Sequence, residues 1–177
     1  MKILYPILAV ALIFGSFSIG RTMAADPVSF NVGEFTFERP EGWGWVSSTS
    51  PMRKAQLKVE GSDGALGEVV FFHFGPGQGG GVDANVQRWL AQFQGGEPGT
   101  SRREVLGDRG VTFVEATGTF LSGMPGTPAV PMDGFALRGA ILESPGGDVY
   151  VKFTGPAEVV EANSSAFESM VRSAVKP

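Results

Sequence analysis

The stretch VVFFHF at residues 69–74 decides the fold, because it is apolar on both of its alternating faces. Successive side chains of a strand point to opposite faces of the sheet, so a strand of this kind needs cover on both sides. Residues 54–59 read KAQLKV, in which apolar residues alternate with polar ones. This alternation is typical of a strand with one buried and one solvated face. The turn residues Ser62-Asp63-Gly64 separate the two stretches.

Five further stretches are predicted to be strands, because apolar residues alternate in them and turn residues bound them. They are residues 35–38, 103–106, 111–120, 135–143 and 149–153. Residues 121–133 contain three prolines, which cannot donate to a sheet ladder, so a loop is predicted there. Strands that are mostly joined by short hairpins predict an antiparallel sheet.

Two helices are predicted to cover this sheet. The first begins at Asp83 as its N-cap residue and ends at about Gln94. Its apolar face consists of Val82, Val86, Leu90 and Phe93, and its polar face of Asn85, Arg88 and Gln92. The second begins at about Ala157, with a candidate interruption at Asn163-Ser164. The predicted fold class is α+β, an antiparallel β-sheet with helices packed on its faces.

Composition excludes several classes of protein. The chain has 177 residues, a net charge of −4, one histidine and no cysteine. Without cysteine there is neither a disulfide framework nor a thiolate metal site, and a single histidine allows no multi-histidine site. An acidic chain offers no electrostatic footprint for nucleic acid. We therefore expect no metal, no cofactor and no nucleic-acid partner.

The first 24 residues have the three-part pattern of a signal peptide. Lys2 precedes an almost entirely apolar run over residues 3–20, and Thr22 and Ala24 suit positions −3 and −1 of a cleavage site. An uncleaved membrane anchor is the alternative. Cleavage removes two of the 14 basic residues and none of the 18 acidic ones, so the net charge becomes −6. Residues 25–177 then form one predicted domain without a membrane span, exported to the periplasm or the cell exterior.

Two ends of this predicted domain resemble a known family. Residues 35–43, FTFERPEGW, are similar to the F-x-x-P-x-G-W opening of PsbP-like domains, and residues 151–156, VKFTGP, precede a helix with Phe167 and Met170. The middle of the chain resembles exported bacterial proteins of unknown function. The resemblance implies a PsbP-like α/β/α sandwich that acts as a non-enzymatic accessory or binding module. It transfers no photosystem role, because no cofactor-assembly residue can be matched.

The glycine-rich segment GPGQGGG at residues 75–81 lies between a predicted strand and a predicted helix. It satisfies G-x-G-x-x-G, and its backbone amides could hold an anion at the helix N-terminus. A dinucleotide site would need a following parallel strand, which is not evident, and Pro76 lacks an amide donor. A P-loop is excluded because no Lys-Ser/Thr pair follows. Small-anion binding, peptide binding and a purely conformational loop remain.

Polar side chains on both sides of this segment complete the candidate binding surface. Hydrogen-bonding groups beside exposed backbone amides suit a peptide, a glycan or a carboxylate, carried by a partner in the cell envelope. The competing interpretation is a solvated face with ordinary helix packing. The candidate residues are Arg53, Gln56, Gly77, Gln78, Gly79, Asn85, Arg88 and Gln92.

Two other functions stay open at this point. A small hydrolase would use His73 as its base, but the sequence names neither a nucleophile nor an orienting acid for it. An imidazole that is satisfied inside the fold is the simpler interpretation. A structural envelope component would instead associate through an open edge of the sheet.

Overall fold

The computed structural model describes residues 26–123 and 128–175. The predicted signal peptide, residues 1–24, lies outside the described residues. No helix in the described part of the chain has the length and apolar character needed to cross a membrane.

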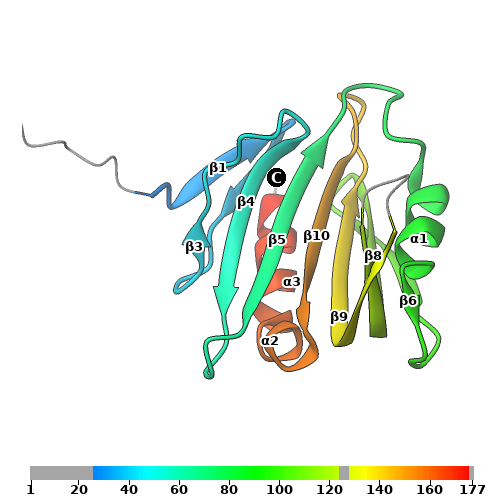
Figure 1. Cartoon of the computed structure of the whole chain (residues 1–177). Coiled ribbons are helices and arrows are strands. Elements are labelled where there is room, and N and C mark those ends of the chain that lie inside the picture. Colours follow the sequence, from blue (N-terminus) through cyan, green and yellow to red (C-terminus); the bar gives the residue numbers. More distant parts are fainter. Residues whose placement is uncertain (1–25, 124–127, 176–177) are drawn as a thin grey trace, which may run out of the picture.

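The centre of the molecule is an eight-stranded sheet in which every pairing is antiparallel (Figure 1). Its strand order is β3-β4-β5-β10-β9-β8-β6, and β7 also pairs with β8. The strands are β3 (Gly44–Trp45), β4 (Arg53–Glu60), β5 (Leu66–His73), β6 (Phe93–Gln94), β7 (Thr100–Leu106), β8 (Arg109–Ser122), β9 (Val130–Leu142) and β10 (Val149–Pro156). A separate hairpin joins β1 (Ser29–Val32) to β2 (Phe35–Glu38). The helices are α1 (Val82–Leu90), α2 (Ala157–Ala162) and α3 (Ser164–Ala174).

The apolar stretch at residues 69–74 forms most of β5, an inner strand between β4 and β10, as predicted. Val69 and Phe71 are fully buried on one face, and Val70 is buried on the other. In β4 the apolar residues are buried and the lysines are exposed, which confirms the alternation predicted there.

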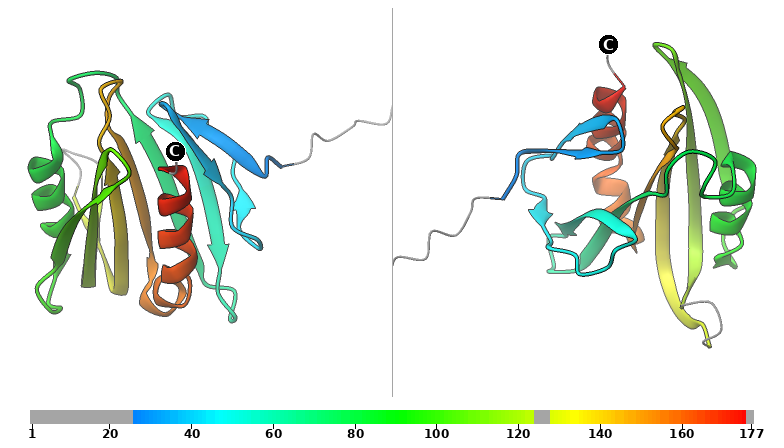
Figure 2. Two further views of the ribbon diagram at one scale, coloured as in Figure 1. Left: turned by 180° about the vertical axis from the view of Figure 1, so that it is seen from behind. Right: turned by 90° about the horizontal axis from the view of Figure 1, so that it is seen from above.

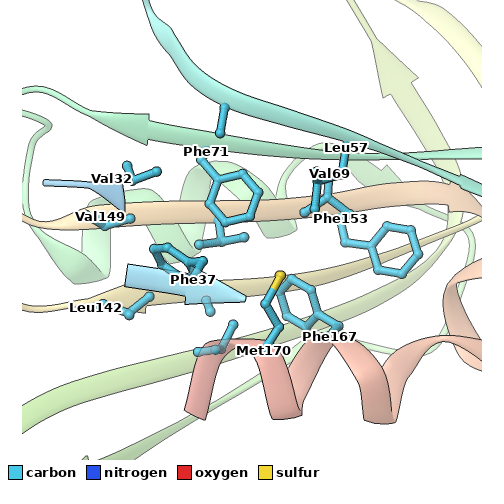
Figure 3. Packing of buried hydrophobic residues seen from close by; sticks show 14 of the residues in the cluster. Val32, Phe37, Leu57, Val69, Phe71, Leu142, Val149, Phe153, Phe167 and Met170 are labelled. Atoms are coloured by element: carbon cyan, nitrogen blue, oxygen red, sulfur yellow. The ribbon is translucent and has the colours of Figure 1, made fainter. Parts of the chain in front are cut away.

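The α3 face of the sheet carries the larger core. Helices α2 and α3 and the β1–β2 hairpin cover it, and it contains two groups of packed aromatic rings (Figure 3). The ring centroids of Phe37 and Phe71 are 5.0 Å apart, and those of Phe153 and Phe167 are 6.0 Å apart. Burial of one such side chain contributes about 1.5–3 kcal/mol. The α3 face therefore holds most of the apolar stabilisation.

The opposite face, the α1 face, is covered over β8, β9 and part of β10 by the short helix α1. Val86 and Trp89 of this helix pack on Leu137, Ile141 and other buried residues. A Cβ at Gly139 would lie 2.5 Å from Cζ3 of Trp89, so glycine is needed for this close approach. Figure 2 shows α1 and α3 on opposite sides of the sheet. The predicted sandwich of helices around an antiparallel sheet is confirmed.

The first helix is shorter than predicted. Its N-cap residue is Gly81 rather than Asp83, and it ends at Leu90 rather than near Gln94. Phe93, assigned above to the apolar face of the helix, lies in β6 and stacks on Phe120 at 5.1 Å. Pairing with the end of β8 therefore outweighs continuation of the helical pattern.

The prediction of a loop over residues 121–133 was wrong at both ends. β8 extends to Ser122 and β9 begins at Val130, with Leu121 paired to Pro131. Pro131 has no backbone N–H to donate, but it lies at the start of β9, where the lack of this donor is tolerated. Pairing between the two long strands therefore continues into the region predicted to be a loop. Residues 124–127 lie outside the described part of the chain.

Candidate functional site

The glycine-rich loop, residues 75–81, has an inner and an outer face. Its five glycines all have positive φ, between 67° and 97°, a region that other residues rarely adopt. A Cβ at Gly77 would meet nothing within 4 Å, whereas a Cβ at Gly79 would lie 2.6 Å from the hydroxyl oxygen of Tyr150. Gly77 thus faces open space, and Gly79 closes over β10. In Figure 1 this loop connects the end of β5 to α1.

Asn85 fastens the loop to α1. Its Nδ2 donates to the carbonyl oxygens of Gly79 and Gly81, each at 2.7 Å, and its Oδ1 accepts a 2.8 Å hydrogen bond from Nη1 of Arg88. The side chain is 5% exposed, although the helical pattern placed it on the polar face. Burial is tolerated because both ends of the amide are hydrogen-bonded. Asn85 is therefore a structural anchor for the loop and for Arg88.

Arg88 is exposed beside this anchor. A Cβ at Gly80 would lie 3.6 Å from its Nη2, so the guanidinium borders the loop. Among the described residues no carboxylate forms a salt bridge with Arg88. The planar donors of a guanidinium match a carboxylate or a phosphate in bidentate geometry. Arg88 is thus a positioned cation without a charge partner in the described part of the chain.

Tyr150 lies directly beneath the loop, a position that the sequence analysis did not single out. It is 2% exposed, and its hydroxyl has no hydrogen-bond partner among residues 26–123 and 128–175. Burial raises the pKa of Tyr150, the nearby Asp148 carboxylate raises it further, and Arg88 opposes both. Most buried hydroxyls are hydrogen-bonded, and the Asp148 carboxylate is near enough to act on this one, although no hydrogen bond of ordinary geometry joins them.

The remaining candidates form separate groups. Arg53 donates to Glu68 at 2.7 Å and to Gln56 at 3.0 Å, and Gln56 donates to Glu68 at 2.7 Å. Arg53 pairs with Phe72 and Phe72 pairs with Tyr150, so Arg53 is two strands away, about 10 Å by strand spacing. In this half-exposed group the charge of Arg53 is already paired with that of Glu68.

Gln92, just beyond α1, accepts a hydrogen bond from Nζ of Lys152. The amine lies 5.1 Å from the ring centroid of Phe120. Burial lowers the pKa of Lys152 to about 8, and the charge of Glu68 partly opposes this shift. The sequence analysis missed Lys152, although a lysine within the apolar stretch at residues 149–153 was a usable signal.

His73 is held by the backbone. Its Nε2 lies 3.2 Å from the carbonyl oxygen of Gly146, and its ring packs beside Gly33 and Val149. In the described residues no serine, threonine or carboxylate forms a hydrogen bond with the ring. The geometry matches a satisfied imidazole at the rim of the core.

The structure thus divides the eight predicted residues into three groups. One is the loop with helix α1, one lies on β4, and one joins the residues just after α1 to β10. Gly77, Gln78, Gly79, Asn85 and Arg88 form the first group, Arg53 and Gln56 the second, and Gln92 the third.

Comparison with known proteins supports the architecture. The solution structure of cyanobacterial PsbP (CyanoP) from Synechocystis sp. PCC 6803 matches with a TM-score of 0.50, over 86% of this chain and 95% of that one. The chain has a PsbP-like fold. This confirms the fold implied by the sequence resemblance. The two sequences are 12% identical, so the likeness concerns the fold alone. No protein-family model and no curated protein matches the chain. In this PsbP-like fold, the candidate site is the loop between β5 and α1.

Proposed function

We propose that this protein is a non-catalytic, exported binding module, and that it holds a carboxylate of a partner protein in the cell envelope. The site is the glycine-rich loop, residues 75–81, together with Asn85 and Arg88. The observation that carries the proposal is the exposed guanidinium of Arg88, which Asn85 fixes beside the loop and which forms no salt bridge with a described carboxylate.

The chemistry favours a carboxylate that belongs to a larger partner. A guanidinium that is held before binding loses less conformational entropy when it forms a bidentate pair. Phe74, the residue just before the loop, is 40% exposed, and its ring centroid lies 6.0 Å from that of Tyr150. An apolar side chain on the partner would bury this ring, which a free ion cannot do. A peptide segment with an acidic and an apolar residue therefore fits best.

Export belongs to the same proposal. The signal-peptide pattern of residues 1–24 supports it, with a periplasmic or extracellular location. Hydrolysis through His73 has less support, because the ring contacts a backbone carbonyl rather than a nucleophile or an orienting acid among the described residues.

The test is capture of envelope proteins by the protein as its host exports it, compared with Arg88→Gln and Arg53→Gln. We expect Arg88→Gln to reduce capture at least tenfold while the variant stays folded, although loss of the hydrogen bond to Oδ1 of Asn85 lowers its melting temperature. Arg53→Gln is the matched control, because the Arg53 guanidinium already pairs with Glu68, and it should retain most of the capture. Unchanged capture by Arg88→Gln would refute the site. The extract is also treated with protease or with glycosidase before capture. If only glycosidase abolishes capture, the partner is a glycan and not a protein.

A further inference from the structure

Strand β7 is a long free edge of the sheet. It pairs with β8 over all seven of its residues and with no other described strand. Five of the seven residues are exposed. The edge at the other end of the sheet is formed by β3, which has only two residues. An exposed strand of this length presents a row of backbone groups with which another strand can pair.

The backbone groups of Ser101, Arg103 and Val105 point away from the sheet. Gly110 lies opposite Val105 on β8, and its carbonyl oxygen accepts a 2.9 Å hydrogen bond from the N–H of Glu143 on the other side of β8. Val105 and Gly110 are thus a pair without mutual hydrogen bonds, and such pairs alternate with hydrogen-bonded ones along an antiparallel ladder. The three N–H and three C=O groups that point outward have no backbone partner among the described residues.

The charges of β7 select one arrangement of a second copy. In an antiparallel pair centred on Arg103, Arg102 of each copy lies opposite Glu104 of the other, which gives two pairs of opposite charge. The outward groups of the two strands also face one another in this register, so all of them find partners. A parallel pair in register would instead place like charges side by side, which is unfavourable.

Two arginines meet at the centre of this arrangement, but their charges are compensated. Arg103 donates two hydrogen bonds, of 2.8 and 3.0 Å, to the carboxylate of Glu143 in its own copy. Arg102 and Glu104 lie on the other face of β7, where salt bridges of 2.9 and 2.8 Å hold them to residues of α3. The charged groups at the edge are therefore positioned before a second copy arrives.

An exposed valine gains cover in the same register. Val105 is 67% exposed. In the second copy it would lie opposite Ser101, which lines a groove of about 380 Å³ together with Val82 and Val86 of α1. Burial of this apolar side chain against the groove favours the pairing.

We propose that two copies of this chain form a dimer through antiparallel pairing of their β7 strands, about a twofold axis at Arg103. The axis is perpendicular to the sheet, so the two sheets become continuous and both copies of α1 lie on the same side. Each copy has one such edge, so the assembly closes as a dimer. Tyr150, beneath the glycine-rich loop, lies on β10, three strands from β7 or about 14 Å by strand spacing. The dimer is therefore independent of the function proposed for the loop.

The first test is sedimentation equilibrium of the protein as its host exports it. One strand pair is a small interface, so we expect a reversible dimer with a dissociation constant of about 10 μM to 1 mM. Ser101→Pro removes an outward N–H and places a ring at the edge, so it should weaken dimerisation at least tenfold. Ser101→Ala keeps the N–H and is the matched control. A parent protein that stays monomeric at about 1 mM, or equal dimerisation by the two variants, would overturn the proposal.

Charge reversal tests the register. Arg102→Glu places carboxylates opposite each other across the axis, and Glu104→Arg places guanidinium groups there, so each variant alone should dimerise at least tenfold more weakly than the parent. An equimolar mixture of the two variants restores opposite charges and should dimerise like the parent. Loss of a salt bridge to α3 does not explain such a rescue, because the mixed proteins still lack it. A mixture that remains monomeric would refute the register.

Amide hydrogen exchange locates the pairing within β7. The outward amides of Ser101, Arg103 and Val105 should exchange at least twofold more slowly at about 1 mM than at about 10 μM protein, where the dimer dissociates. The amides of Arg102 and Glu104 donate to β8 in either state and are the internal control. Outward amides whose exchange does not depend on concentration would show that β7 is not the interface.

Discussion

The two faces of the sheet are built differently. On the α3 face, 23 buried hydrophobic residues form one cluster beneath α2, α3 and the β1–β2 hairpin. On the α1 face the corresponding cluster has seven. The two buried polar residues of the described chain, Asn85 and Thr112, lie on the α1 face, as does the buried hydroxyl of Tyr150. A third buried polar atom without a partner, Nε of Arg138, shares the α3 face with Ala136 and Ala140. The α3 face therefore holds the large core, and the α1 face combines a thin core with two of the three unpartnered polar atoms of the described residues.

This difference separates stability from recognition. Buried polar groups without partners cost stability, and proteins retain such groups mainly where they serve a function. A large core on the α3 face allows the α1 face to carry them. The glycine-rich loop, the short helix α1 and the proposed carboxylate site lie on the less stabilised face.

The largest expected effect is the loss of a core aromatic ring. Phe153→Ala removes a fully buried side chain from the α3 face, and we expect it to lower the free energy of unfolding by about 3–5 kcal/mol. Chemical denaturation measures this loss. The matched pair Val151→Ala on the α3 face and Val86→Ala on α1 sharpens the comparison, because both remove the same two methyl groups. A larger loss for Val86→Ala would contradict the unequal division of stability.

The buried amine of Lys152 gives the next largest effect. Its pKa in the folded protein is about 8, below its ordinary value of 10.5, because burial disfavours the charged form. The folded state therefore binds fewer protons than the unfolded state between these two values. Below pH 8 the amine is charged in both states, so its burial lowers the free energy of unfolding by the full desolvation penalty. The free energy of unfolding therefore rises as the pH increases from about 8 to 10.5.

Lys152→Met tests this relation on the α1 face. This substitution should raise the free energy of unfolding at pH 7 by at most about 3 kcal/mol. The difference from the parent protein should become smaller as the pH increases from about 8 to 10.5. Denaturation at several pH values, with the parent as control, measures the difference. A gain that does not change between pH 7 and 10.5 would contradict the lowered pKa.

The glycine-rich loop offers a matched pair of smaller effect. Gly77→Ala and Gly79→Ala both place a Cβ at positive φ, but only Gly79→Ala drives it against the hydroxyl of Tyr150. We expect Gly77→Ala to cost about 1 kcal/mol and Gly79→Ala about 1–3 kcal/mol more. Equal losses in thermal unfolding would show that the loop does not close over Tyr150.

The smallest expected effect is an increase in the free energy of unfolding. Tyr150→Phe removes a buried hydroxyl without a partner and should raise the free energy of unfolding by about 1 kcal/mol. Chemical denaturation of the variant and of the parent protein measures this difference. A loss of stability in Tyr150→Phe would mean that the hydroxyl is hydrogen-bonded in solution.

Local patterns in the chain were sufficient for most of the sheet. The alternation at residues 54–59, the two-sided apolar stretch at 69–74 and the turns at 107–110 and 145–147 all act within a few residues, and the structure has strands and hairpins there. The start of the second helix at Ala157 and its interruption at Asn163 were also predicted correctly, whereas the ends of the first helix and the paired ends of β8 and β9 were predicted poorly. They depend on pairing between segments that the local pattern does not describe, as the Leu121 and Pro131 pair illustrates.

By itself the sequence determined the fold class, the two-sided burial of β5, the glycine-rich loop and two polar residues beside it, Asn85 and Arg88. Hydrophobic periodicity and turn preferences are local properties of the chain, and they were sufficient for these features. Only the tertiary structure decided that Asn85 is buried, that Tyr150 lies beneath Gly79, and that Thr112 lines a pocket with Asp83. The physical reason is that burial and the loss of a hydrogen-bond partner arise when distant strands and helices pack together.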